Sequence, residues 1–161
     1  MRKTLVLAVP AAGLLTLLAT LTVARAARET HASAVRKAVV ISTRRLPKLG
    51  TVLVDGKGRT LYMFVPDKRK RVTCVRTCAA VWPPVKLPKA AKPAARAKAK
   101  AALLGSDRDP AGGRVVTYNR WPLYTYVADT VPGQAKGQAL NLNGGLWYVL
   151  APDGKVIRKK P

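Results

Sequence analysis

A short aromatic motif occurs twice in this chain with the same internal spacing. Each copy begins with leucine and tyrosine, has a second aromatic residue two positions after the tyrosine, and ends in an aspartate three positions later. The copies are Leu61–Asp67 and Leu123–Asp129, and the interval between the two tyrosines equals that between the two aspartates. Matches at several positions with one constant interval indicate a tandem duplication. The chain is therefore expected to contain two related structural units.

Short apolar runs surround both copies and predict β-strands. In the first copy, two runs flank Asp55-Gly56-Lys57-Gly58, a turn composition typical of a β-hairpin. In the second copy, two runs flank Asn119-Arg120-Trp121-Pro122 in the same manner. The expected strands are 51–54, 59–65, 114–118, 123–127, 146–150 and 155–157.

The strand that carries the first motif is apolar on both faces. Tyr62 and Phe64 share one face, and Leu61, Met63 and Val65 share the other. Covering both faces requires two stacked layers or a closed barrel. We therefore expect a mainly β fold, in which two related β-hairpin repeats form a small sandwich or a barrel-like domain.

The N-terminus has the organisation of an export signal. Arg2 and Lys3 precede an apolar run over 5–23, and Ala24-Arg25-Ala26 fits the small-x-small pattern that signal peptidase recognises. Residues 1–26 are therefore expected to be a signal peptide cleaved near Ala26, which leaves a secreted or extracytoplasmic protein with no integral membrane span. A retained membrane anchor is the alternative, because a bilayer-spanning helix needs about 20 apolar residues.

The rest of the chain divides by composition. Residues 27–47 are basic and alanine-rich and are expected to form a flexible basic arm. Residues 48–158 are expected to form a single β-rich domain, with repeats at about 50–85 and 113–155. An Ala/Lys-rich segment at 86–104 joins the repeats, either as an extended linker or as a short helix from Ala94 onward.

The chain is strongly basic, with 30 Lys and Arg against 7 Asp and Glu and a formal net charge of +23. Removal of the signal peptide leaves about +20, a charge that attracts polyanions. In an exported protein, the candidate partners are polyanionic polymers of the cell envelope, anionic lipid surfaces and extracellular nucleic acid, and the charge alone does not choose among them. No sequence-specific nucleic-acid recognition is expected. Solubility alone is the alternative explanation of this charge.

Cys74 and Cys78 are the only cysteines, and export places them where disulfides persist. A structural disulfide is therefore expected. A redox-active pair is the alternative, because Arg71 and Arg76 would favour a thiolate. The apolar segment 79–84 beside the pair indicates packing and favours the structural interpretation.

Both motif copies, the cysteine pair and the segment Trp82-Pro83-Pro84 resemble those of predicted bacterial lipoproteins with a Yx(FWY)xxD motif, also called the secreted repeat of unknown function. The resemblance covers roughly residues 50–155 and implies export, and no biochemical activity defines the family. One departure is that no cysteine lies near the expected cleavage site, so lipid attachment is not expected here.

The repeated residues are the candidate site, and two interpretations of them remain open. In the structural one, the aromatic pairs face a core and each aspartate accepts hydrogen bonds from backbone N–H groups or a tyrosine hydroxyl. In the functional one, tyrosine and aspartate from both copies line a small polar site for a ligand or cation. The candidate residues are Tyr62, Phe64, Asp67, Tyr124, Tyr126 and Asp129.

No catalytic constellation can be assembled from these residues. The only histidine, His31, lies in the expected arm, away from any nucleophile. No cofactor and no metal site are expected. The sequence thus predicts an exported, non-enzymatic, envelope-associated or secreted binding or structural module. The alternative is a thiol-redox, electron-transfer or copper-related accessory protein that uses Cys74 and Cys78.

Overall fold

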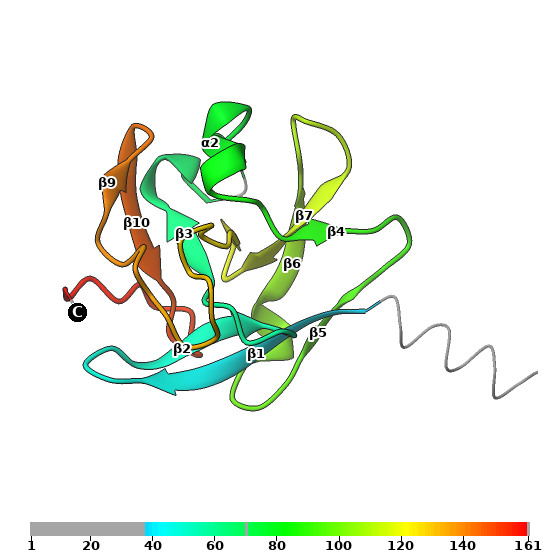
Figure 1. The fold of residues 1–161 in the computed structure, drawn as a ribbon. Coiled ribbons are helices and arrows are strands. Elements are labelled where there is room, and N and C mark those ends of the chain that lie inside the picture. The colour runs from blue at the N-terminus through cyan, green and yellow to red at the C-terminus, as the bar shows by residue number, and fades with distance from the viewer. Residues whose placement is uncertain (1–37, 70, 161) are drawn as a thin grey trace, which may run out of the picture. The chain divides into compact units, whose positions relative to one another are not determined.

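The computed structural model describes residues 38–69 and 71–160, which fall in one compact unit (Figure 1). The signal peptide expected at 1–26 and the first part of the arm expected at 27–47 lie outside the described residues.

Short strands dominate the described chain, as the sequence predicts. The one α-helix labelled in Figure 1 is α2 (Thr77–Val81), and 3-10 turns lie at Val65–Asp67 and Ala101–Leu103. Among the described residues, no helix has the length and apolar character needed to span a membrane. The strands are β1 (Val39–Leu46), β2 (Gly50–Asp55), β3 (Tyr62–Phe64), β4 (Lys86–Leu87), β5 (Pro93–Ala95), β6 (Leu104–Arg108), β7 (Arg114–Tyr118), β8 (Trp121–Pro122), β9 (Asn141–Leu142) and β10 (Gly145–Val149).

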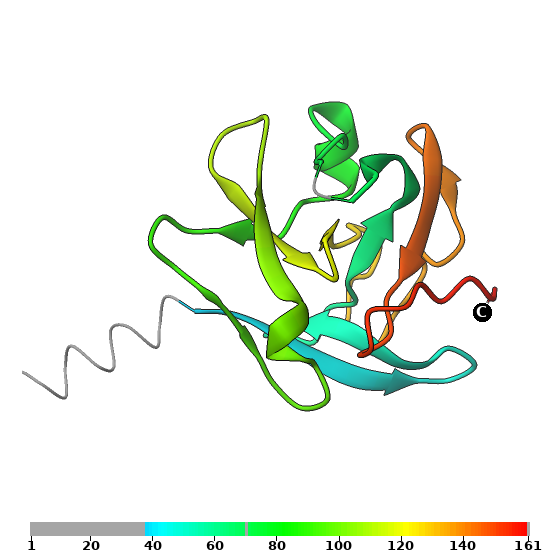
Figure 2. The same cartoon turned by 180° about the vertical axis from the view of Figure 1, so that it is seen from behind.

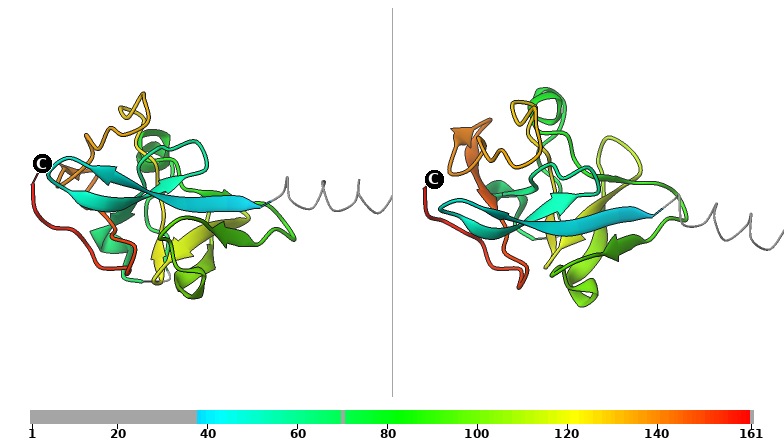
Figure 3. Two further views of the ribbon diagram at one scale, coloured as in Figure 1. Left: turned by 90° about the horizontal axis from the view of Figure 1, so that it is seen from below. Right: turned by 60° about the horizontal axis from the view of Figure 1, so that its bottom comes forward.

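The strands form three small sheets with orders β2-β1-β5, β3-β10-β9 and β4-β7-β6, and β8 extends the last one through β7. Seen from behind, β6 and β7 lie at one side of the domain and β9 and β10 at the other, with the β1–β2 hairpin below both (Figure 2). From below, this hairpin runs across the domain (Figure 3). Over residues 38–69 and 71–160 the arrangement is sandwich-like, and these strands form no closed barrel.

The two motif copies meet backbone to backbone at the centre of the domain. The Tyr62 N–H donates to the Tyr124 carbonyl at 2.9 Å, and the Tyr124 N–H donates to the Tyr62 carbonyl at 3.0 Å. Such reciprocal pairing of equivalent residues is the pattern of a two-fold symmetric interface. The two repeats therefore pack within one chain as the two subunits of a symmetric dimer would.

Each repeat also completes the sheet of the other. The Leu53 N–H on β2 donates to the Leu150 carbonyl at 3.0 Å, and the Val116 N–H on β7 donates to the Val85 carbonyl at 2.8 Å. Leu150 lies three residues after Trp147, and Val85 lies three residues after Trp82. The two acceptors therefore hold equivalent positions in the two repeats. Neither repeat therefore has a complete set of backbone partners without the other.

Two apolar clusters form the core, one on each face of the central strand. Tyr62 and Phe64 belong to the first cluster, whereas Leu61 and Met63 belong to the second, with Val65 packed against it. The predicted division of this strand into two buried faces is confirmed. Each cluster contains residues of both repeats, so both repeats contribute to the cover of each face of the strand.

The expectation of a flexible arm up to residue 47 is wrong for its last part. Residues 39–46 form β1, which pairs with β2 from Ile41↔Asp55 to Leu46↔Gly50, so the domain begins near residue 38. Ile41 and Leu46 are buried, whereas Arg44 and Arg45 are exposed. The exposed arginines gave the segment the composition of an arm, although its apolar positions anchor it to the core.

The expected hairpins are present only in part. The main partner of β2 is β1, and across the Asp55–Gly58 turn the only bridge is Val54↔Thr60. β3 pairs with β10 of the other repeat, and the segment expected as strand 123–127 contributes bridges at Tyr124. In the segment expected as strand 155–157, only Val156 forms a bridge. Local pairing across both turns is therefore present but short, as between β7 and β8, and pairing between distant segments adds to it.

For the Ala/Lys-rich segment 86–104, the structure shows the linker and not the helix. It contains β4, β5 and a single 3-10 turn rather than an α-helix. Ala90 and Ala97 have positive φ angles of 63° and 53°, which a helix does not allow. β5 runs parallel to β1, and this pairing fixes the middle of the linker on the domain.

Candidate functional site

The repeated tyrosines and aspartates form two hydrogen bonds that are exchanged between the repeats. The Tyr62 hydroxyl donates to Asp129 Oδ2 at 2.6 Å, and the Tyr124 hydroxyl donates to Asp67 Oδ2 at 2.7 Å. Each tyrosine therefore bonds the aspartate of the other copy, not its own. The structure brings all four residues together, in an exchange that sequence reasoning did not anticipate.

The second oxygen of each aspartate binds the loop that follows its motif. Asp67 Oδ1 accepts the Thr73 N–H at 2.9 Å and the Thr73 hydroxyl at 2.7 Å. Asp129 Oδ1 accepts the Lys136 N–H at 2.9 Å. Each carboxylate thus joins a loop of its own repeat to a tyrosine of the other repeat, and both of its oxygens accept hydrogen bonds.

The four groups are removed from solvent. Tyr62, Tyr124 and Asp67 are fully buried, and Asp129 is 6% exposed. Burial raises the pKa of the Asp67 carboxyl, and hydrogen bonds from Thr73 and Tyr124 oppose this shift. Burial also raises the pKa of the Tyr62 and Tyr124 hydroxyls, and the partner carboxylates raise it further. Both phenols therefore stay protonated and act as donors.

The other aromatic residues of the motif belong to a stack of four rings. Trp82 and Trp147 lie face to face with centroids 3.9 Å apart and planes 4° from parallel. Phe64 stacks on the outer face of Trp147 at 4.1 Å, and Tyr126 stacks on the outer face of Trp82 at 4.1 Å. The order Phe64, Trp147, Trp82, Tyr126 alternates between the repeats, so the stack is a second connection between them.

The hydrogen-bonded tyrosines pack edge-on against this stack. Tyr62 meets Trp82 at 5.4 Å and 77°, and Tyr124 meets Trp147 at 5.2 Å and 88°. These are favourable geometries for aromatic pairs. Gly137 permits the close packing, because a Cβ there would lie 2.7 Å from Trp82 and 2.9 Å from Tyr62. The tryptophans complete the site, but their side chains carry no chemistry that would mark them as site residues in the sequence.

Cys74 and Cys78 form the expected disulfide. Both belong to the first apolar cluster and are only 1% and 9% exposed. This burial favours a structural bond, because a redox-active disulfide must be reached by its partner. Within residues 38–69 and 71–160, no three His, Cys, Asp or Glu side chains come together in a way that could hold a metal ion.

We expect Asp67→Ala and Asp129→Ala each to lower the free energy of unfolding by about 1–3 kcal/mol, because each leaves a buried tyrosine hydroxyl and a loop N–H without an acceptor. Urea unfolding of the two variants measures the effect. Asp153→Ala is the control, since Asp153 is exposed and pairs only with Lys155 at the surface. Variants at 67 and 129 as stable as the parent would favour a ligand site instead.

Comparison with known proteins agrees with the internal repeat. A family model described as a secreted repeat of unknown function matches residues 44–86 and 106–151. Each matched segment contains one copy of the motif and one tryptophan of the central stack. No curated protein and no solved structure matches the chain.

Proposed function

Because the chain belongs to the family of secreted repeats of unknown function, we propose that it is an exported, non-enzymatic module that binds anionic polymers of the cell envelope through its surface. The disulfide supports an extracytoplasmic location. The proposal places binding on the surface because the hydrogen bonds of the repeated motif are used inside the fold.

The observation that carries the proposal is the separation of the two signs of charge. Every Lys and Arg among the described residues is exposed. Most of the aspartates, in contrast, are buried: Asp55, Asp67, Asp109 and Asp129. The surface therefore carries cations with very few anions between them, and such a field attracts polyanions.

The buried aspartates are occupied by groups of the protein itself. Asp55 pairs with Arg59 at 2.7 Å, and Asp109 pairs with Lys86. Asp67 and Asp129 accept the tyrosine hydroxyls. Most of the positive charge on the surface is therefore not neutralised by a neighbouring carboxylate.

The linker supplies a dense group of these cations. Its backbone has turns at 89–90 and 97–98, and Arg96 and Lys98 are bonded through their backbone N–H groups to Ile41 and Thr43 of β1. The exposed basic residues of the linker are Lys89, Lys92, Arg96, Lys98 and Lys100. Cations repeated at short intervals along a segment can contact successive charges of a linear polymer. The basic linker therefore supports a polymer rather than a compact small molecule as the ligand.

Binding to teichoic acid, heparin or DNA is the test, measured at several salt concentrations. We expect the affinity to fall on the order of 10- to 100-fold between 50 and 200 mM salt, because neutralised anions release their counterions. Uncharged dextran is the control and should not bind. An affinity that does not change with salt would contradict binding through surface charge.

A further inference from the structure

We infer that a hollow between β1, the turn after β2 and the segment after β5 binds the backbone of a linear phosphodiester polymer, with Arg44, Lys57 and Arg96 as its cationic contacts. This inference rests on the proposed function and names its site and ligand class.

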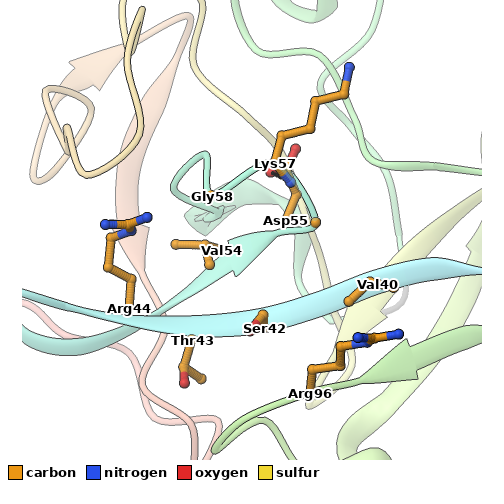
Figure 4. Close-up of a pocket in the computed structure, with 10 residues that line it drawn as sticks. Val40, Ser42, Thr43, Arg44, Val54, Asp55, Lys57, Gly58 and Arg96 are labelled. Atoms are coloured by element: carbon orange, nitrogen blue, oxygen red, sulfur yellow. Dashed lines mark hydrogen bonds between the residues drawn. The ribbon is translucent and has the colours of Figure 1, made fainter.

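Three separate segments contribute the cations that line this hollow, and their side chains stand at different sides of it (Figure 4). Arg44 lies on β1, Lys57 lies in the turn that follows β2, and Arg96 follows β5. The Arg96 N–H donates to the Ile41 carbonyl at 2.9 Å, which fixes the position of Arg96 beside β1. The hollow has a volume of about 670 Å³, so it has room for more than one phosphate group.

The one carboxylate in the hollow does not neutralise these cations. Asp55 is held by the Arg59 guanidinium at 2.7 Å and accepts the N–H groups of Lys57 and Arg59 at 2.9 Å. Arg44, Lys57 and Arg96 form no ion pair with any described residue. The hollow therefore carries a net positive charge that an anion can neutralise.

The position of Arg44 is partly set by packing. Gly58 has a φ of +79°, and a Cβ there would lie 3.2 Å from Arg44 Nη2 and 3.3 Å from Pro132 Cβ. A glycine at this position lets the turn backbone approach the guanidinium closely. A guanidinium held in this way presents the planar donor fork that suits two oxygens of a phosphate.

The corresponding turn of the second repeat makes different contacts. There Asn119 donates through Nδ2 to the Gly154 carbonyl at 3.0 Å, and Trp121 packs against the second apolar cluster. The segment Asn119-Arg120-Trp121-Pro122 thus makes contacts that Asp55-Gly56-Lys57-Gly58 does not make in the first repeat.

An adjoining hollow extends the site in one direction. Its volume is about 360 Å³, it shares Val40 and 55–57 with the first hollow, and it reaches Lys86. Two adjoining hollows suit a chain longer than one repeating unit. No aromatic side chain lines either of them, so nucleic-acid bases would have no surface on which to stack. A phosphodiester polymer without bases, such as poly(glycerol phosphate), is therefore the favoured ligand.

The test compares two triple variants of equal charge for binding to poly(glycerol phosphate). The site variant is Arg44→Gln/Lys57→Gln/Arg96→Gln, and the control is Arg108→Gln/Arg120→Gln/Lys136→Gln, whose positions are exposed and line neither hollow. We expect the site variant to lose affinity on the order of tenfold or more, with a salt slope smaller by about 2, and the control to lose less than about threefold. Polyglutamate and single-stranded DNA of matched charge should bind the parent more weakly.

The outcomes separate this inference from the proposed function. Equal losses in both triple variants would overturn the site and leave binding by overall charge. Equal or tighter binding of polyglutamate would overturn the phosphodiester ligand class, and equal or tighter binding of DNA would overturn the preference for a polymer without bases. A parent that binds no polyanion at low salt would overturn the proposed function itself. If the site variant does not fold, the single variant Arg44→Lys replaces it. This variant keeps the positive charge but loses the planar pair of guanidinium donors, and it should weaken binding about threefold or more. Unchanged binding would overturn the role of Arg44.

Discussion

Replacing Trp147 with alanine is expected to lower the free energy of unfolding by about 3–5 kcal/mol, the range typical of a large aromatic side chain removed from a core. Trp147 is fully buried and contacts three aromatic rings, Trp82 and Phe64 by stacking and Tyr124 by its edge. Its indole N–H also donates to the Leu142 carbonyl at 2.9 Å. A loss of this size is a large fraction of the about 5–15 kcal/mol that stabilises an ordinary domain.

Denaturant unfolding followed by circular dichroism measures this effect. Trp121→Ala is the matched control, because Trp121 is partly exposed and lies outside the stack, so the loss there should be smaller. Trp82→Ala should cost about as much as Trp147→Ala, since the two rings hold equivalent positions in the two repeats. A Trp147→Ala variant no less stable than Trp121→Ala would show that the stack does not hold the repeats together.

The sequence predicts only part of the exchanged hydrogen bonds. The repeat indicates that Tyr62 and Tyr124 are equivalent, and the alternation of apolar residues indicates that they are buried. A bond from Tyr62 to Asp67 or to Asp129 is equally consistent with the sequence, because both aspartates belong to the same motif. The choice depends on the Tyr62–Tyr124 backbone bridge, which is a long-range contact without a local signal.

The same reason explains why β1 and the basic hollow could not be predicted. β1 contains Arg44 and Arg45, whose charge suggests an arm, and only its pairing with β2 shows that Ile41 and Leu46 are interior. The hollow combines β1, a turn and the linker, and composition does not show that they meet. The disulfide was predictable because Cys74 and Cys78 are the only cysteines in a chain that begins with the organisation of an export signal.

Alkaline pH is expected to destabilise the domain steeply, because two of its buried groups can ionise only when it unfolds. Burial raises the pKa of Tyr62 and Tyr124 above the ordinary tyrosine value of about 10, at which the unfolded chain titrates. Above that pH the native state binds more protons than the unfolded state, so the free energy of unfolding falls as pH rises. The slope is about 1.4 kcal/mol per pH unit for each tyrosine, or about 2.7 kcal/mol for both.

Urea unfolding at a series of pH values, together with the ultraviolet absorbance of tyrosinate, tests this expectation. Below about pH 9 these two groups contribute no slope, since they are protonated in both states. Tyr62→Phe should be less stable at neutral pH, because Asp129 loses its hydrogen-bond donor, and its alkaline slope should be smaller than that of the parent by about 1.4 kcal/mol per pH unit. Tyr124→Phe should behave in the same way, because Asp67 loses the corresponding donor. If all tyrosines of the parent ionised near pH 10 without unfolding, the hydroxyls would be open to solvent, and the motif would have to be considered a ligand site again.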